Sequence, residues 1–171
     1  MKRQAFTLIE LLIVIGIIAT LSAVVVFDFR GVRQSQVLNS TVQELDALVQ
    51  QSRAEVRAGK STAEWEWLCE GVALEVGQAP QKLEGQVDFE SGKCQETSRS
   101  DYGLGSDAVR IQQIQVGEEI LSGTTELWFV PPDGLAQIWQ ADVQLNAQLQ
   151  VVLMLTANES ATRTYSFDPA S

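Results

Sequence analysis

The most unusual ionisable residue is Glu10, the single charged side chain within an apolar run over residues 6–27. Of the 22 residues in this run, 17 are apolar. A carboxylate at the centre of a membrane segment costs on the order of 2.5 to 3.5 kcal/mol, and less near the end of the segment, where Glu10 lies. Such a carboxylate predicts a functional partner with a positive charge. The favourable field of a helix N-terminus is the alternative explanation.

The chain has two cysteines, Cys69 and Cys94, on either side of 24 residues that contain several turn signals. Outside the cytoplasmic membrane such a pair predicts a disulfide, which contributes about 3 kcal/mol in the loop-entropy argument. Two free buried thiols are the alternative. A metal site is disfavoured because two cysteines without histidine and without Cys-x-x-Cys spacing provide no ligand set.

The composition excludes several kinds of chemistry. The chain contains no histidine, so it has neither a Ser-His-Asp triad nor a histidine-ligated zinc, and no other residue pattern predicts catalysis or a cofactor. The formal charge of -10, from 12 basic and 22 acidic residues, disfavours nucleic-acid binding. The one local basic cluster is Arg53, Arg57 and Lys60. Its position is also explained by a helix C-terminus, where the helix dipole favours positive side chains.

Acidic side chains in the second half of the chain do not form a calcium loop. They are Asp101, Asp107, Glu118 and Glu119. Their spacing does not match that of an EF-hand, so solvated acidic loops are expected.

The apolar run is long enough to cross a membrane as a helix. At 1.5 Å per residue it measures about 33 Å, compared with about 30 Å for the hydrocarbon core of a bilayer. A cleaved secretory signal is disfavoured because the best cleavage position, after Ala23, leaves four apolar residues behind it. A plain uncleaved anchor explains the length but gives Glu10 no role.

A third interpretation rests on the residues themselves. A short leader with Lys2, Arg3 and the small residue Ala5 precedes Phe-Thr-Leu-Ile-Glu over residues 6–10 and the apolar run. This arrangement resembles the class III signal of the type IV pilin and type II secretion pseudopilin superfamily. The family usually has Gly where this chain has Ala5.

The resemblance implies that a prepilin peptidase cuts between Ala5 and Phe6 and methylates the new amino group of Phe6. It implies that Glu10 acts in assembly by pairing with the positive amino group of Phe6 on a neighbouring subunit. Buried opposite charges specify register more reliably than they add stability, so Glu10 would align incoming subunits.

The same resemblance implies partners and a location. The partners are other pilin or pseudopilin subunits, which pack through the N-terminal helix, together with prepilin peptidase and the membrane. The location is the cytoplasmic (inner) membrane, with a single pass and the C-terminal domain outside, and afterwards a pilus or pseudopilus. A membrane-anchored extracytoplasmic binding module that does not polymerise is the alternative function.

Residues 30–60 predict an amphipathic continuation of the helix. Apolar residues at helical spacing form one stripe, namely Leu38, Val42, Leu45, Val49 and Val56. Polar residues occupy the other faces, and Gly59 is the predicted stop. The stripe is expected to pack on the core of a globular domain.

From residue 71 the hydrophobic period changes to two, which predicts strands. Alternation includes Val72, Leu74 and Val76, then Val87 and Phe89, then Val109, Ile111, Ile114 and Val116. Residues 127–130 and 135–139 flank Pro-Pro-Asp-Gly, a strong turn signal. Residues 149–155 and 164–167 predict the last strands, separated by a polar stretch over residues 158–162.

We therefore expect an α+β fold in which a long N-terminal helix packs on an antiparallel, β-rich globular domain. The expected organisation is a leader at residues 1–5, a transmembrane and filament-core helix at 6–29, its amphipathic continuation at 30–60, and the globular domain at 61–171. The order of these elements is similar to that of minor pilins and H-type pseudopilins, the GspH/FimT group.

Overall fold

A computed structural model of the chain describes residues 8–59, 68–102 and 108–169, with the backbone alone for residues 23–30. The chain divides into two compact units, residues 1–36 and residues 37–171, and we call the second one the head unit. The described elements, in chain order, are α1 (Leu8–Arg57), β1 (Leu68–Glu75), β2 (Gln81–Val87), β3 (Cys94–Asp101), β4 (Val109–Val116), β5 (Glu119–Leu121), β6 (Thr124–Val130), β7 (Leu135–Gln140), β8 (Val143–Leu145), β9 (Leu149–Leu155) and β10 (Asn158–Phe167).

The C-terminal part of α1, residues 37–57, belongs to the head unit and buries one face. The buried side chains recur every three or four residues, as one side of an amphipathic helix requires. They are Leu38, Thr41, Leu45, Leu48, Val49, Ser52 and Val56. Four of the five residues of the predicted stripe are among them, and Val42 is half-buried against the same core.

The helix ends at Arg57 in a turn that contains Gly59. The amide of Gly59 donates to the carbonyl of Val56 at 3.0 Å, which satisfies one of the free carbonyls of the last turn. The φ of Gly59 is 71°, in the left-handed region that closes many helices and that glycine adopts without a Cβ clash. The residue type therefore explains where the helix stops.

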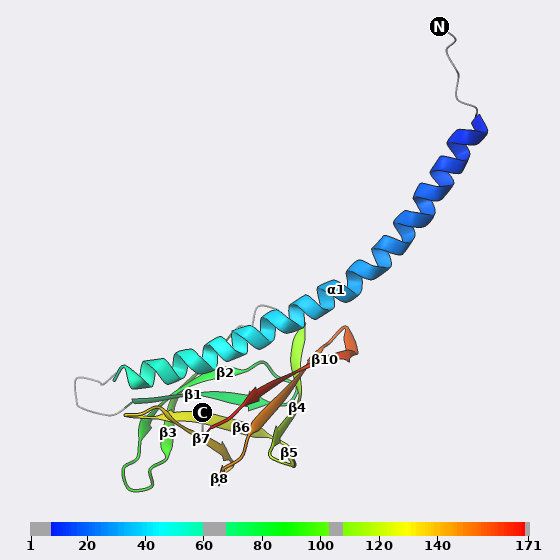
Figure 1. Cartoon of the computed structure of the whole chain (residues 1–171). Coiled ribbons are helices and arrows are strands. Elements are labelled where there is room, and N and C mark those ends of the chain that lie inside the picture. The colour runs from blue at the N-terminus through cyan, green and yellow to red at the C-terminus, as the bar shows by residue number, and fades with distance from the viewer. Residues whose placement is uncertain (1–7, 60–67, 103–107, 170–171) are drawn as a thin grey trace. The chain divides into compact units, whose positions relative to one another are not determined.

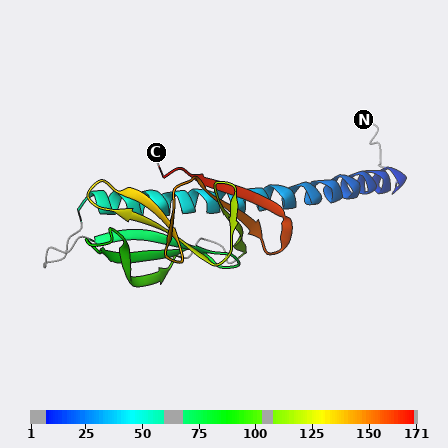
Figure 2. The same cartoon turned by 90° about the horizontal axis from the view of Figure 1, so that it is seen from below.

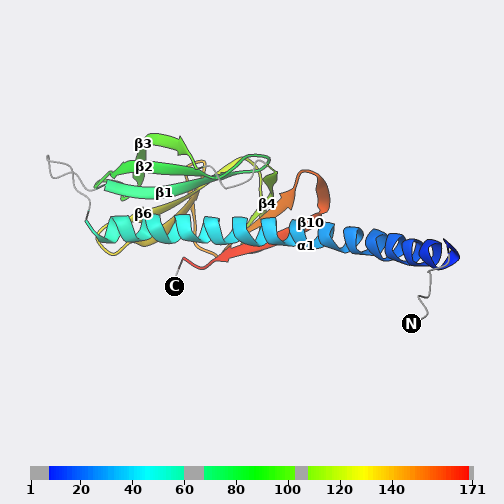
Figure 3. The same ribbon diagram turned by 90° about the horizontal axis from the view of Figure 1, so that it is seen from above.

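The strands of the head unit form two antiparallel sheets. One sheet has the order β3-β2-β1-β6-β7-β8 and the other the order β10-β9-β4-β5. In Figure 1 these strands lie on one side of the cyan part of α1, and Figure 3 shows that this part of the helix runs along β1 and β6. An α+β fold with a helix packed on antiparallel sheets is thereby confirmed.

One main core joins α1 to both sheets. It contains Leu45 and Leu48 from the helix, Leu127 from the six-stranded sheet and Leu153 from the four-stranded sheet, all fully buried. Phe129 of β6 contacts Phe167 of β10 edge to face, with ring centroids 6.0 Å apart. Figure 2 shows the strands of the head unit from the opposite side to Figure 3.

A second, smaller core lies on the other face of the six-stranded sheet. It contains five buried residues, Cys69, Ala73, Leu83, Cys94 and Trp128. Strand β1 is consequently buried on both faces, which hides the alternation that its sequence predicts. Long side chains also span this face of the sheet. Arg99 of β3 lies 3.5 Å from Glu126 of β6, although β2 and β1 separate the two strands.

Several strand predictions need correction. Strand β1 ends at Glu75 and β2 ends at Val87, so Val76 and Phe89 follow the strands and are exposed. The polar stretch at residues 158–162 belongs to β10 rather than to a loop, with a register shift against β9 between Asn158 and Thr162.

The apolar residues of strand β4 change from odd to even positions along the strand, and a β-bulge explains this change. Val109 and Ile111 are odd-numbered whereas Ile114 and Val116 are even-numbered, yet all four are buried. The register with β9 shifts between Ile111 and Gln113, as a β-bulge requires. The extra residue returns the apolar side chains to the same face of the sheet.

Candidate functional site

The first fifteen described residues of α1, residues 8–22, present apolar side chains on every side. The large ones are 47% to 77% exposed. They are Leu8, Ile9, Leu11, Leu12, Ile13, Val14, Ile15, Ile17, Ile18 and Leu21. Because residues 11–15 are consecutive and cover more than one turn, the helix has no polar face that would suit water.

The polar side chains of this segment suit an apolar environment. The hydroxyl of Thr20 donates to the carbonyl of Ile17 at 2.9 Å, and that of Ser22 donates to the carbonyl of Ile18 at 2.8 Å. Both hydroxyl protons are therefore satisfied within the helix, which removes most of the penalty for their burial. Glu10 is the single charged residue between residues 8 and 22.

Glu10 lies in the first described turn of α1 and is exposed. The N-terminal end of a helix carries a partial positive charge, so the macrodipole favours a carboxylate there. Ala5 and Phe6, the predicted cleavage and methylation residues, lie outside the described residues. The structure thus places the one charged group of the apolar segment at its N-terminal end.

No helix within the described residues has the length and hydrophobicity that a membrane crossing requires. The segment for which the sequence predicts a crossing, residues 6–27, includes two residues that are not described and five whose side chains are not described.

Cys69 and Cys94 form a disulfide between β1 and β3, with β2 between them in the sheet. Both residues are almost fully buried, beside Trp128. The bond therefore links an edge strand to the centre of the sheet and fills space in the second core. Its burial indicates a stabilising role rather than an exposed reactive one.

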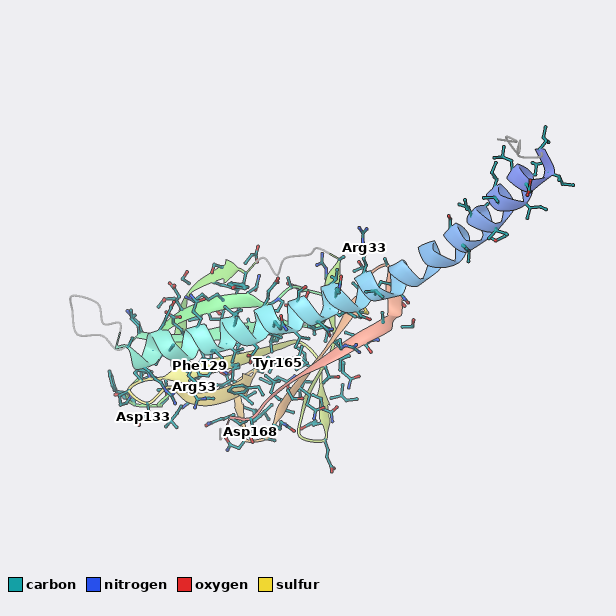
Figure 4. The ribbon with its side chains drawn as sticks, turned by 45° about the horizontal axis from the view of Figure 1, so that its top comes forward. Arg33, Arg53, Phe129, Asp133, Tyr165 and Asp168 are labelled. Carbon is teal, nitrogen blue, oxygen red and sulfur yellow. A yellow bond between two sulfur atoms is a disulfide. The ribbon has the colours of Figure 1, made fainter. Side chains whose placement is uncertain are left out.

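Two residues of the basic cluster bind the turn between β6 and β7. The Nε of Arg57 donates to the carbonyl of Asp133 at 2.8 Å, and the Nε of Arg53 donates to that of Gly134 at 3.2 Å. Figure 4 shows Arg53 and Asp133 close together at the end of the helix. Lys60 lies outside the described residues. These hydrogen bonds explain the two arginines without a nucleic acid.

An ionic cluster that the sequence does not predict lies between the helix and the six-stranded sheet. The ammonium of Lys82 on β2 lies 3.0 Å from a carboxylate oxygen of Glu55 on α1 and 3.0 Å from one of Glu70 on β1. The side chain of Glu70 is 6% exposed. No local pattern predicts this cluster, because its three members are separate in the sequence.

The cluster changes the protonation of its members. Burial, together with the neighbouring Glu55 carboxylate, raises the pKa of Glu70 in spite of the ammonium of Lys82. Burial alone would lower the pKa of Lys82, but hydrogen bonds to and charges of Glu55 and Glu70 outweigh this effect and raise it. One ammonium therefore pairs with two carboxyl groups, and Glu70 keeps its proton to a higher pH than a free glutamate does.

Tyr165 of β10 makes a second polar contact with the helix. Its hydroxyl donates to a carboxylate oxygen of Asp46 at 3.4 Å, and its side chain is buried. Burial and the charge of Asp46 both raise the pKa of Tyr165. The phenol thus remains a neutral donor that helps to hold α1 on the four-stranded sheet.

Within residues 8–59, 68–102 and 108–169, no three histidine, cysteine or acidic side chains lie close enough to hold a metal ion. Asp101, Glu118 and Glu119 are exposed, and Asp107 lies outside the described residues.

The N-terminal residues match a known family model. Residues 1–26 match the prokaryotic N-terminal methylation motif, and this match includes Ala5, Phe6 and Glu10. No curated protein and no solved structure matches the chain. The chain therefore carries the N-terminal methylation motif, the class III signal of type IV pilins and pseudopilins, and its helix packed on antiparallel sheets is a pilin-like arrangement.

Proposed function

We propose that the chain is a structural subunit of a type IV pilus or of a type II secretion pseudopilus. A prepilin peptidase removes residues 1–5 and methylates Phe6, and the processed chain assembles through its N-terminal helix. The observation that carries this proposal is the helix over residues 8–22, whose apolar side chains are exposed on every side. The methylation motif over residues 1–26 supports the same conclusion independently.

The energetic argument rests on how much apolar surface needs covering. Burial of a large aliphatic side chain contributes roughly 1.5 to 3 kcal/mol, and ten such side chains are exposed between residues 8 and 21. Docking onto one surface would cover only one side of this helix. A bilayer before assembly, and neighbouring helices on all sides in a filament core after it, cover the whole circumference.

Glu10 has a specific role in this scheme. Its carboxylate pairs with the positively charged, methylated amino group of Phe6 of a neighbouring subunit. In a medium of low dielectric constant two such charges attract strongly when they are paired, and each is costly when it is alone. The pair therefore favours one axial position of an incoming subunit over others.

The remaining parts of the chain take the following roles in this proposal. Residues 6–29 form the membrane and filament-core helix, residues 30–60 continue it, and residues 61–171 form the domain on the outer side of the inner membrane and on the filament surface. The order of short strands, a Pro-rich turn and final strands supports a minor subunit of the GspH/FimT kind.

The mass of the protein extracted from membranes tests processing directly. We expect a chain that begins at Phe6 and carries one additional methyl group. A chain that retains residues 1–5 would support the alternative, an anchored binding module that does not polymerise. Peptide mapping of the N-terminus distinguishes methylation of Phe6 from methylation elsewhere.

Variants at Glu10 test assembly separately from membrane insertion. We expect Glu10→Ala and Glu10→Gln to leave the protein in the membrane fraction and to reduce its incorporation into sheared filaments by at least tenfold, since one charge of the pair is lost. Glu118→Ala is the matched control because it removes an exposed carboxylate from the head unit. Normal incorporation of both Glu10 variants would contradict the role of Glu10.

A further inference from the structure

We propose that the head unit binds a cationic side chain of another protein, a lysine ammonium or an arginine guanidinium, in a cavity beside Trp139. The cavity has a volume of about 680 Å³. Its walls come from β5 of the four-stranded sheet, from β6, β7 and β8 of the six-stranded sheet, from the turns next to these strands, and from Lys93 in the turn before β3. It is therefore a surface distinct from the N-terminal helix.

The cavity has an aromatic wall that attracts positive charge. The ammonium of Lys93 lies 4.9 Å from the centroid of the Trp139 ring, within the distance of a cation–π interaction. The Nε1 of Trp139 donates to the side-chain oxygen of Gln137 at 3.0 Å, which orients the ring. The head unit thus already shows one ammonium bound by the chemistry that we assign to the site.

The other walls carry more negative charge than Lys93 neutralises. Glu119, Glu126 and Asp142 line the same cavity. Asp142 pairs with Lys93 at 2.7 Å, and Glu126 lies 3.5 Å from Arg99. Among the described residues Glu119 has no ion-pair partner, so the cavity retains an uncompensated carboxylate for a second cation.

The pair between Lys93 and Asp142 is one that an incoming cation can exchange. The side chain of Asp142 is 98% exposed and that of Lys93 is 28% exposed. Exposed ion pairs of this kind contribute little to stability, because water and salt screen the attraction. A partner's cation therefore replaces Lys93 at Trp139 and Asp142 with little loss, and it gains the attraction of Glu119.

Backbone strain at the rim of the cavity supports a function there. Gln140 pairs with Val143, so Ala141 and Asp142 form a two-residue turn between β7 and β8. The φ of Ala141 is 43°, in the left-handed region, which is unfavourable for a residue with a Cβ. The strained residue directly precedes Asp142 in the turn, and backbone strain of this kind is concentrated at binding sites.

The charge of the chain indicates where the cation comes from. Each copy has a formal charge of -10, and residues 30–171 contain 10 basic and 20 acidic residues. Association of two such head units through this cavity would bring like charges together. A basic segment of a different protein suits the site better than a second copy of this chain.

The test measures binding of a fluorescent oligolysine peptide, with blocked ends, to the full-length protein in neutral detergent. We expect saturable binding that weakens with added salt, since the attraction is electrostatic. The same peptide with acetylated lysines has no positive charge, and we expect no binding of it. Because Glu10 takes no part, Glu10→Ala should bind the peptide normally even if it does not assemble.

Two matched pairs of variants locate the site. We expect Glu119→Gln to weaken binding roughly two- to fivefold and its neighbour Glu118→Gln, which does not line the cavity, to leave binding unchanged. We expect Lys93→Met to strengthen binding by a similar factor because it frees Trp139 and Asp142. Arg163→Met removes the same charge from β10 of the other sheet, and we expect a smaller effect.

Equal affinities within each matched pair would overturn the proposal, since they would show attraction by net charge alone. Absence of oligolysine binding at low salt would overturn it as well. If two copies of the protein associate through the cavity in the absence of peptide, the cavity is a self-association surface instead. Neither Glu119→Gln nor Glu118→Gln removes a buried group, so both variants should fold.

Discussion

Trp128 on β6 lies directly opposite Gly71 on β1, and its indole ring occupies the space that a side chain at Gly71 would need. The same ring extends to Gly85 on β2, the cross-strand neighbour of Cys69. Two glycines on adjacent strands thus allow a tryptophan to lie against the backbone of the sheet. The ring is fully buried there, beside the disulfide.

We expect Gly71→Ala to lower the free energy of unfolding by about 1 to 3 kcal/mol, the usual effect of overpacking. A Cβ at residue 71 would lie 2.5 Å from the carbonyl oxygen of Leu127 and 3.0 Å from the ring of Trp128. Urea unfolding followed by tryptophan fluorescence measures the change. Gly31→Ala is the control, because a Cβ there meets nothing within 4 Å and alanine favours a helix.

Replacement of both cysteines by alanine should remove about 3 kcal/mol of stability, because the disulfide closes a loop between residues 25 apart. Reduction of the wild-type protein with a thiol should produce a loss of similar size, and it should have no effect on the double variant. Equal unfolding midpoints for oxidised and reduced wild-type protein would disprove this account of the disulfide.

Ala141→Gly should stabilise the head unit by about 0.5 to 1 kcal/mol. Glycine adopts the left-handed conformation at this position without the Cβ clash, although it loses more entropy on folding than alanine does. Ala147→Gly, in the connection before β9, is the control, and we expect no stabilisation from it. A destabilised Ala141→Gly protein would show that the turn is not strained.

Glu70→Gln should change how stability depends on pH. Because the folded-state pKa of Glu70 is raised above its ordinary value of 4.5, its contribution to stability is complete below about pH 4.5 and is lost as the pH rises through the folded-state pKa. The glutamine variant does not lose this contribution, so its stability relative to wild type should increase from pH 4.5 upward. Unfolding free energies measured across this range test the sign.

The control for this experiment is Glu84→Gln, which removes an exposed carboxylate 4.0 Å from the same Lys82. We expect the pH profile of this variant to follow that of wild type. A Glu70→Gln profile parallel to the wild-type profile at all pH values would refute the raised pKa.

Two N-terminal truncations should have opposite effects on the head unit. A chain that begins at Arg30 lacks the exposed apolar segment and retains the helix residues of the main core, so it should fold and be more soluble. A chain that begins at Gly59 lacks Leu45 and Leu48, among others, and should not fold cooperatively. Near-ultraviolet circular dichroism and urea unfolding distinguish these outcomes.

The sequence predicts well those elements whose signal is local. The basic leader, the apolar run and Glu10 identify the methylation motif within 26 residues. The apolar stripe from Leu38 to Val56 identifies the buried face of α1, because a regular helix repeats it every three or four residues. The turn at residues 131–134 likewise separates β6 from β7.

Strand β3 shows why other elements escaped prediction. Its sequence is polar, and seven of its eight residues are exposed, because it is an edge strand with no core to face beyond Cys94. Its strand conformation comes from hydrogen bonds with β2 and from the disulfide, neither of which leaves a hydrophobic period. Strand β4 was predicted, but the bulge that moves its apolar residues from odd to even positions became visible only in the register with β9.

The sequence by itself determined the methylation motif at the N-terminus and the division into an apolar helix and an acidic, strand-rich remainder, because a short motif, composition and short periods encode them. Only the tertiary structure decided which distant residues meet. It brought Lys82 to Glu55 and Glu70, Trp128 to Gly71, and Lys93 to Trp139 and Asp142. These contacts depend on strand order and register, which are set by packing of the whole head unit and leave no local pattern in the sequence.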